Sequence, residues 1–314
     1  MPGSTPASGL PDARPDAAPD AAPDDGSADA LSPLTQLRRR LMRHRGVQIG
    51  FVLFATVALL ALLAPWIAPQ DPYAQDLLQR LKPPVWHEKG SWEFLLGTDH
   101  LGRDYLSRLL HGARISLTIG VLAACIGAVI GTTLGVCAGY FGGRVDHVVN
   151  YLLTCQLALP GLLLAMALVF LIGPSTPVVI IVIGLLHWTY FLVVARAAAQ
   201  QLRQLDFVNA ARAIGSSRLQ IIVHELLPNL ANPLIVVFTL EVGVAIVAEA
   251  SLSFLGVGVP SPTPSWGLMI AEGRSFMFVR PELVLLPGLA LFLLVISINM
   301  AGDGLRDATA PGGR

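Results

Sequence analysis

The sequence predicts an all-α membrane protein with six transmembrane helices. Of its 314 residues, 54% are hydrophobic and only 13% are charged, whereas a soluble domain carries about a quarter charged residues. The mean hydropathy is +0.63, and the apolar residues gather into runs long enough to cross roughly 30 Å of hydrocarbon, which takes about 20 helical residues. The formal net charge is zero. A nucleic-acid partner is therefore not expected, because it would require a basic surface.

The chain divides into a tail, a membrane domain and a short C-terminal end. Residues 1–35 are acidic and rich in Pro, Ala and Asp. They have too few large apolar side chains to offset the entropy of ordering, so they are expected to be disordered. Residues 36–307 form the transmembrane domain and 308–314 a C-terminal tail. The predicted spans cover residues 47–69, 113–139, 148–173, 177–199, 232–257 and 282–301.

A basic cluster directly precedes the first span and sets the orientation. It consists of Arg38, Arg39, Arg40, Arg43 and Arg45. Basic residues next to a span stay in the cytoplasm, so the N-terminus is expected there, and six crossings return the C-terminus to the same side. Segments 70–112 and 258–281 are then outside and 200–231 is inside. The Asp and Arg residues around Gly97 and Gly102 are interpreted as a turn, or equally as a solvated charged surface.

The inner segment 200–231 has the pattern of two short helices with a break. Its first apolar stripe consists of Leu202, Leu205, Val208, Ala211 and Ile214. Gly215 begins a Gly-Ser-Ser break, apolar residues resume at Leu219, and Pro228 is expected to stop the second helix within a turn. Two interpretations are open for this amphipathic pair: docking into the groove of a partner protein, or lying on the lipid surface.

The second span carries a stripe of small residues at four-residue spacing, Gly127, Gly131, Gly135 and Gly139. Small residues at this spacing let two helix backbones approach closely. The stripe predicts that this span packs against protein and not against lipid.

Motifs for catalysis and for metal or nucleotide binding are missing from the sequence. The only lysines, Lys82 and Lys89, are followed by Pro and Gly, so there is no phosphate-binding Gly-Lys-Ser/Thr loop. His224-Glu225 begins like a zinc-protease helix, but Pro228 replaces the second histidine. The three cysteines lack ligand spacing. We expect no catalytic residue, no metal site and no cofactor bound by this chain.

Ionisable residues inside spans are costly and therefore suggest function. Glu241 and Glu249 lie in the fifth span, eight residues and about 80° apart around a helix, so both could line a polar passage. Alternatively, Glu249 lies near water at the outer end and Glu241 pairs locally. His187 in the fourth span is interpreted as a hydrogen-bonded packing residue in preference to a proton relay. A proton-coupled secondary transporter would use these three groups.

The inner segment resembles the cytoplasmic loop of ABC-importer permeases that contains a Glu-Ala-Ala motif. The matching residues are Asp206, Asn209, Ala210, Ala211, Gly215, Leu227 and Pro228. In that family the loop docks into a cleft of the ATPase subunit, and the resemblance implies the same for this segment, hereafter the coupling loop (residues 200–231). Asn209 stands where the family usually has Glu, which puts a charged contact in doubt. Asp206 is expected to cap the helix.

Three further segments narrow the resemblance. Residues 96–104 (LGTDHLGRD), 250–258 (ASLSFLGVG) and 302–307 (GDGLRD) resemble the second, C-type permease subunit of dipeptide, oligopeptide and nickel importers. The resemblance covers about residues 35–307.

Membership of that family would imply a type I importer bundle with cytoplasmic coupling helices. The implied function is one half of a translocation pathway in a bacterial inner membrane, with di- or oligopeptides as first choice of substrate and nickel or another small solute as the alternative. The implied partners are a homologous second permease, two ATPase subunits that hold ATP and Mg²⁺, an extracytoplasmic binding protein and the surrounding lipid.

Overall fold

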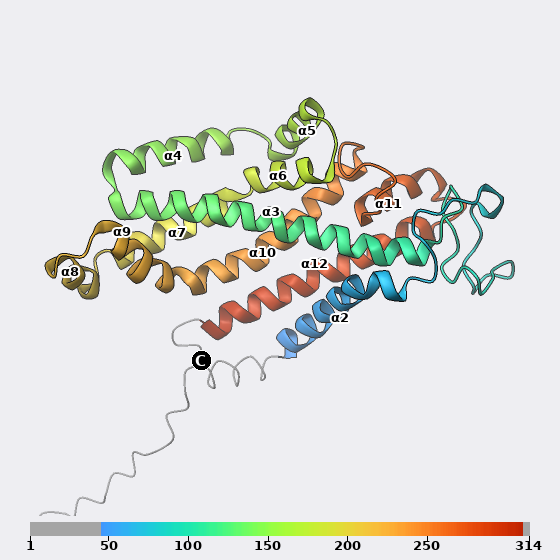
Figure 1. Ribbon diagram of the computed structural model, residues 1–314, viewed down its shortest axis with the longest axis horizontal. Coiled ribbons are helices and arrows are strands. Elements are labelled where there is room, and N and C mark those ends of the chain that lie inside the picture. Colours follow the sequence, from blue (N-terminus) through green and yellow to red (C-terminus); the bar gives the residue numbers. More distant parts are fainter. Residues whose placement is uncertain (1–44, 310–314) are drawn as a thin grey trace, which may run out of the picture.

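The computed structural model describes residues 45–309 (Figure 1). The predicted tail 1–35 and most of the basic cluster that set the orientation lie outside the described residues. Within the described part, the chain folds into helices, and its only β pairing is an isolated bridge between Thr98 and Asp104. The helices form an elongated bundle, with α8 and α9 at one end and the irregular segment 68–104 at the other (Figure 1).

The longer helices are α2 (Arg45–Ile67), α3 (Tyr105–Phe141), α4 (Gly143–Leu157), α5 (Gly161–Ile172), α6 (Thr176–Leu186), α7 (Trp188–Leu202), α10 (Leu227–Phe254) and α12 (Glu282–Thr309). The shorter ones are η1 (Leu77–Gln79), α8 (Asp206–Ala213), α9 (Arg218–Gln220), a π-helix labelled η2 (Ile221–Leu226), α11 (Trp266–Gly273) and η3 (Arg274–Phe276). Five helical stretches among the described residues are long and apolar enough to cross a membrane, and the bent pair α4–α5 would make a sixth. The predicted all-α membrane fold is confirmed.

The predicted span 148–173 is two helices in the structure. α4 and α5 meet at an angle of 85°, and Pro160 precedes the first residue of α5. Proline has no N–H to donate and disfavours helical backbone in the residue before it. The apolar run therefore did not reveal the bend within this predicted span, because hydropathy does not register a break of this kind.

The second span begins earlier than predicted, at Tyr105 instead of residue 113. Asp104 caps the helix by accepting a hydrogen bond from the Ser107 N–H at 2.8 Å. The first turns contain the buried Ser107 and Arg108, whose polarity hid them from a search for apolar residues. The outer segment 258–281 likewise contains a helix, α11, which begins after its cap Ser265.

Pro228 does not end the helix that precedes it. α9, the π-helix and α10 run on from Arg218 to Phe254, and Pro228 lies in the first turn of α10. Proline removes one backbone donor and crowds the carbonyl four residues earlier. The wider π register of residues 221–226 directly before it accommodates this local change, as π-bulges do within helices.

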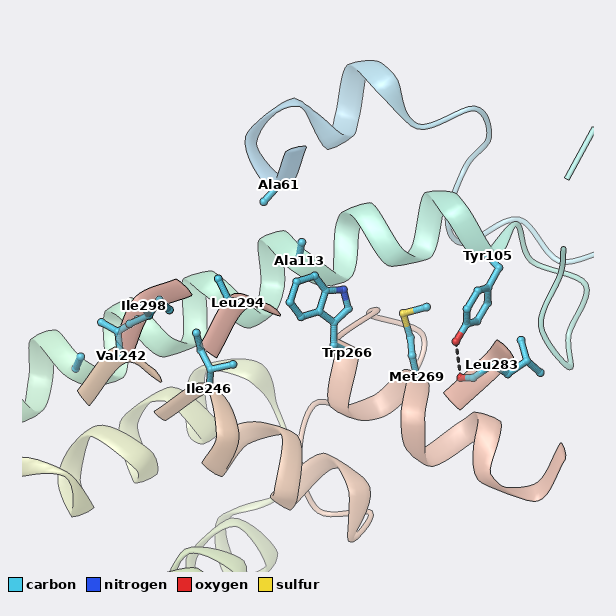
Figure 2. Packing of buried hydrophobic residues seen from close by; sticks show 11 residues of the cluster. Ala61, Tyr105, Ala113, Val242, Ile246, Trp266, Met269, Leu283, Leu294 and Ile298 are labelled. Carbon is cyan, nitrogen blue, oxygen red and sulfur yellow. Dashed lines mark hydrogen bonds between the residues drawn. The ribbon is translucent and has the colours of Figure 1, made fainter. Parts of the chain in front are cut away.

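The main core lies between α3, α10, α11 and α12 (Figure 2). Trp266 and Met269 of α11 point toward α3, and Ile246 of α10 packs nearby. The Trp266 indole donates to the Leu109 carbonyl at 2.9 Å. Gly112 makes room for this ring, since a Cβ there would lie 2.9 Å from Trp266 Cδ1. The short helix α11 is thereby fixed against the N-terminal half of α3.

Candidate functional site

The coupling loop presents one buried and one exposed face. On α8, Val208 is fully buried and Ala211 nearly so, in a cluster with Val136 and Tyr140 of α3 and Ala195 of α7. Ala211 is therefore part of the loop's own packing. α8 therefore shares its buried face with the ends of two membrane helices.

The opposite face of the loop exposes both polar and apolar side chains. The predicted residues Asp206, Asn209 and Ala210 are exposed there. Beyond α8, Ile214 is 84% and Leu219 is 70% exposed. Large apolar side chains left open on a polar helix pair form a surface that a partner protein or lipid would cover.

Asp206 does not cap α8. Leu205 occupies the cap position without a side-chain bond, and Asp206 is the first helical residue. Its carboxylate still lies in the first turn, where a negative charge is favoured by the helix dipole. Asn209, one turn on, is exposed and makes no reciprocal cap bond to residue 206 among the described contacts.

Gly215 ends α8 in a left-handed conformation, with φ of +86°. Its N–H donates to the Arg212 carbonyl at 3.1 Å, and the Ser216 N–H donates to the Ala211 carbonyl at 3.0 Å. These two bonds define a Schellman motif, whose reversal point favours glycine because a Cβ would be strained there. The turn at the end of α8 therefore explains why the motif has a glycine at this position.

The second half of the loop begins with a capping box that the sequence analysis missed. The Gln220 N–H donates to Ser217 Oγ, and the Ser217 N–H donates to Gln220 Oε1. The spacing Ser-x-x-Gln was the available signal. Farther along, Leu227 and Pro228 are exposed at the start of α10.

Two arginines attach the coupling loop to the end of α3. Arg203 donates to the carbonyls of Gly139 and Tyr140, both at 3.2 Å. The Arg212 guanidinium lies 5.4 Å from the centre of the Tyr140 ring, in a cation–π arrangement. The last turn of α3 has carbonyls without helical partners, and a cation is favoured there.

The glycine stripe of α3 faces α7. A Cβ added at Gly127, Gly135 or Gly139 would lie 3.1, 2.6 and 2.6 Å from the carbonyl oxygens of His187, Leu192 and Arg196, respectively. At Gly131 the added atom would meet the Trp188 carbonyl and lie 2.6 Å from Phe191 Cβ. The two helix backbones are therefore in direct contact along this stripe.

Glu241 is buried and paired with His187. Its Oε2 lies 2.8 Å from His187 Nδ1, with side-chain exposures of 3% and 17%. The neighbouring Trp188 indole donates to Gln156 Oε1 of α4, and Gln156 Nε2 donates to the Leu186 carbonyl at 2.6 Å. The structure thus brings Glu241 and His187 together, at the break between α6 and α7.

Glu249 is separate from that pair and is 0% exposed. It accepts hydrogen bonds from Ser253 at 2.7 Å, Ser265 at 2.8 Å and Ser116 at 3.4 Å. Water does not reach it at the outer end, contrary to one alternative above. The carboxylate joins α10, α3 and the cap of α11. Pathway lining by Glu241 and Glu249 remains a prediction.

A buried ion-pair cluster, which sequence reasoning missed, ties the outer segment to α11. Arg103 Nε lies 2.6 Å from Asp99 Oδ2, and the Nη2 atoms of Arg103 and Arg108 each lie 3.0 Å from Glu272 Oε2. Both arginine side chains are 0% exposed. The solvated-surface alternative for this charged turn is therefore wrong. Arg108 Nε approaches Asp99 at 3.3 Å without hydrogen-bond alignment.

The same cluster contains the one group of metal-ligating residue types found among the described residues. Asp99, His100 and Glu272 each place a ligand atom within 4.8 Å of the others. Both carboxylates already contact the two arginines. Two neighbouring positive charges oppose a third cation, so this arrangement acts as an ion-pair cluster.

Residues 131–313 match the family model described as the binding-protein-dependent transport system inner membrane component. Residues 32–84 match the N-terminal transmembrane domain of oligopeptide transport permease C. The chain belongs to the inner-membrane permeases of binding-protein-dependent transport systems. The predicted resemblance to the C-type permease subunit is thereby confirmed.

Curated relatives of this permease match over most of the chain. The di/tripeptide transport system permease protein DppC of Pseudomonas aeruginosa is 41% identical over 280 residues, covering 89% of this chain and 92% of that protein. The dipeptide transport system permease protein DppC of Haemophilus influenzae is 39% identical over 280 residues, with coverages of 89% and 95%. The glutathione transport system permease protein GsiD of Escherichia coli is 38% identical over 283 residues, with coverages of 89% and 91%.

A solved structure supports the fold of this permease. The inward-facing MetNI methionine ABC transporter matches with a TM-score of 0.52 at 18% identity, covering 65% of this chain and 97% of that chain. The likeness shows the importer permease fold and nothing about substrate. The coupling loop lies inside the range matched by the transport family, whereas residues 99–108 of the ion-pair cluster lie outside both matched ranges.

Proposed function

We propose that this chain is one half of the translocation pathway of an ATP-driven importer of di- and oligopeptides. It would couple to a separate ATPase through the coupling loop and catalyse no reaction itself. The substrate class is supported by the relatives, of which two are named as dipeptide or di/tripeptide permeases and one as a glutathione permease. Nickel or another small solute is the alternative substrate within the same role.

The observation that carries the proposal is the construction of the coupling loop. Its buried face joins α3 and α7, while Ile214 and Leu219 project from its open side. A partner that grips the open side would move α8 as a lever, and the packing of Val208 would pass that movement into the membrane helices. Closure of an ATPase pair would in this way bias the bundle between outward and inward forms.

The remaining partners and the location follow from this role. A homologous permease would supply the other half of the pathway, and two ATPase subunits would bind ATP and Mg²⁺. An extracytoplasmic binding protein would deliver the peptide. The chain would lie in the bacterial inner membrane, with the coupling loop and both termini in the cytoplasm.

The test is co-purification from native membranes with the wild-type chain, with Ile214→Asp and with Trp92→Asp as a matched control. Ile214 is exposed on the coupling loop, and Trp92 is 82% exposed. Trp92 belongs to the irregular segment 68–104, which lies at the opposite end of the bundle (Figure 1). We expect an ATPase and a second permease with the wild type and with Trp92→Asp, and loss of the ATPase with Ile214→Asp. Absence of an ATPase from the intact wild-type complex would refute the proposal and favour a proton-coupled secondary transporter.

A further inference from the structure

The fourth span, Thr176–Leu202, contains one non-helical residue. α6 ends at Leu186 and α7 begins at Trp188, with His187 between them at φ −96° and ψ 10°. Gln156 compensates for this break, since its amide donates to the Leu186 carbonyl while its oxygen accepts from the Trp188 indole. Irregular backbone at membrane depth is tolerated where it is buried in protein or lines a cavity.

His187 lines a cavity at this break. The pocket has a volume of about 310 Å³ and lies between α5, α6 and α10. Its walls are mainly aliphatic and include Leu162, Ile183, Val247 and Leu252. Ligand sites occupy roughly 300–1,000 Å³, so the pocket lies at the lower end of this range and suits one or two small residues.

The polar part of this wall is backed by a carboxylate. His187 Nδ1 is engaged by Glu241 at 2.8 Å, which leaves Nε2 as the remaining polar atom of the ring. With the Glu241 carboxylate ionised and the ring neutral, Nδ1–H donates to the carboxylate and Nε2 is left as a hydrogen-bond acceptor. In this state the pair carries a net charge of minus one and favours a cationic hydrogen-bond donor over an anion.

We propose that this pocket binds the N-terminal residue of the transported peptide. The residue's side chain would lie against the aliphatic wall and its α-ammonium group at the His187–Glu241 pair. The inference rests on the proposed function and specifies it, because it places a substrate contact inside this chain. Its physical basis is the coincidence of an irregular residue within a span, a paired ionisable residue and a cavity. Ionisable residues inside spans commonly mark substrate pathways.

The negative charge of the His187–Glu241 pair determines which end of a peptide would bind there. The α-carboxylate would be repelled by the ionised Glu241 carboxylate bound to His187, whereas the α-ammonium can donate to His187 Nε2 and offset the negative charge of the pair. A lipid chain or a side chain of the second permease could fill the aliphatic wall, but neither would be sensitive to the Glu241 charge. This difference separates the peptide from the two other occupants.

The experiment uses the complete importer, purified in detergent, with the photoreactive residue benzoylphenylalanine at Val247. Radiolabelled Leu-Ala and N-acetyl-Leu-Ala are added directly at the same concentration, below saturation, without the delivering protein. Val129 is the control position, because it is exposed on α3 and does not line the pocket. We expect Leu-Ala to label Val247 and not Val129. N-acetylation, which removes the ammonium charge, should lower the labelling roughly tenfold or more.

Charge variants at Glu241 distinguish a contact with substrate from a role in folding. Glu241→Gln retains the size and a hydrogen-bond acceptor, and it should label equally with the two peptides. Glu241→Asp retains the charge and should restore the preference for the free N-terminus. A purely structural role would lower both signals in Glu241→Gln and leave their ratio unchanged, which would overturn the inference.

The remaining outcomes also test the pocket proposal and separate it from the proposed function. If the wild-type importer takes up peptide but Val247 captures only lipid or the second permease, the pocket proposal is wrong and the function stands. Equal labelling by both peptides in the wild type likewise rejects the ammonium contact. If no ATPase co-purifies and no peptide is taken up, the proposed function itself fails, and the pocket proposal with it.

Discussion

Glu272→Gln is expected to destabilise the outer end of the bundle by leaving two buried guanidinium groups with too little negative charge. In the native cluster, the charges of Asp99 and Glu272 balance those of Arg103 and Arg108. Glu272 Oε2 accepts from both arginines at 3.0 Å. The glutamine has nearly the same shape, so the change removes charge and leaves the packing in place.

The magnitude follows from the burial of the partners. Removing one partner of a buried ion pair costs about 3–5 kcal/mol. The arginine side chains are 0% exposed and that of Glu272 is 16% exposed, so water reaches the altered position and the lower end, about 3 kcal/mol, applies. At about 2–4 °C per kcal/mol for a domain of this size, the midpoint of thermal unfolding should fall by about 6–12 °C.

The assay is thermal unfolding of the importer in detergent, followed by size-exclusion chromatography of the surviving complex. Glu88→Gln is the matched control, because Glu88 is exposed in segment 70–112, which also contains Asp99 and Arg103, and forms no ion pair among the described residues. The double variant Glu272→Gln with Arg108→Gln restores neutrality, so it should lose less stability than the sum of the single changes. A midpoint for Glu272→Gln equal to that of Glu88→Gln would refute the reasoning.

Three further perturbations test other contacts. Gly131→Ala should separate α3 from α7 and lower the yield of folded protein, measured by size-exclusion chromatography. Gly161 has open space around it, so Gly161→Ala should leave the yield unchanged. Gly215→Ala should strain the end of α8 by about 1–2 kcal/mol and lower transport per ATP hydrolysed, while an unchanged ratio would contradict a mechanical role for this turn. Ser217→Ala should cost about 1 kcal/mol of cap stability and speed amide hydrogen exchange over residues 218–226, without changing exchange in α2.

The sequence contained enough information for the helices and the coupling loop. Apolar runs longer than a bilayer leave few alternatives to a helix, and the Gly215 break matches the Schellman turn in the structure. The errors in helix boundaries at Pro160 and Pro228 arose because the surrounding backbone determines whether a proline ends a helix. Pro160 separates two helices, whereas Pro228 is accommodated after a π-helix.

The buried polar contacts could not be predicted, because they join residues far apart in the chain. Arg103 and Glu272 are 169 residues apart, and His187 and Glu241 are 54 apart. Arg103 had been assigned to a charged turn and His187 and Glu241 to apolar spans, whereas Glu272 had been assigned no role. Nothing in either local pattern specifies the partner, which depends on how α3, α7, α10 and α11 pack together.

α3 contacts both the coupling loop and the buried ion-pair cluster. Its 37 residues make a rod about 55 Å long. Its inner end is held to the coupling loop by Arg203 and Arg212, and its outer end is held to α11 through Arg108. A tilt of about 5° at one end of such a rod displaces the other by about 5 Å. The glycine stripe keeps α7 in backbone contact with the half of α3 next to the coupling loop. In the proposed mechanism, a movement of the coupling loop would therefore shift α3 and α7 together, and α3 alone would carry it to the end at Arg108.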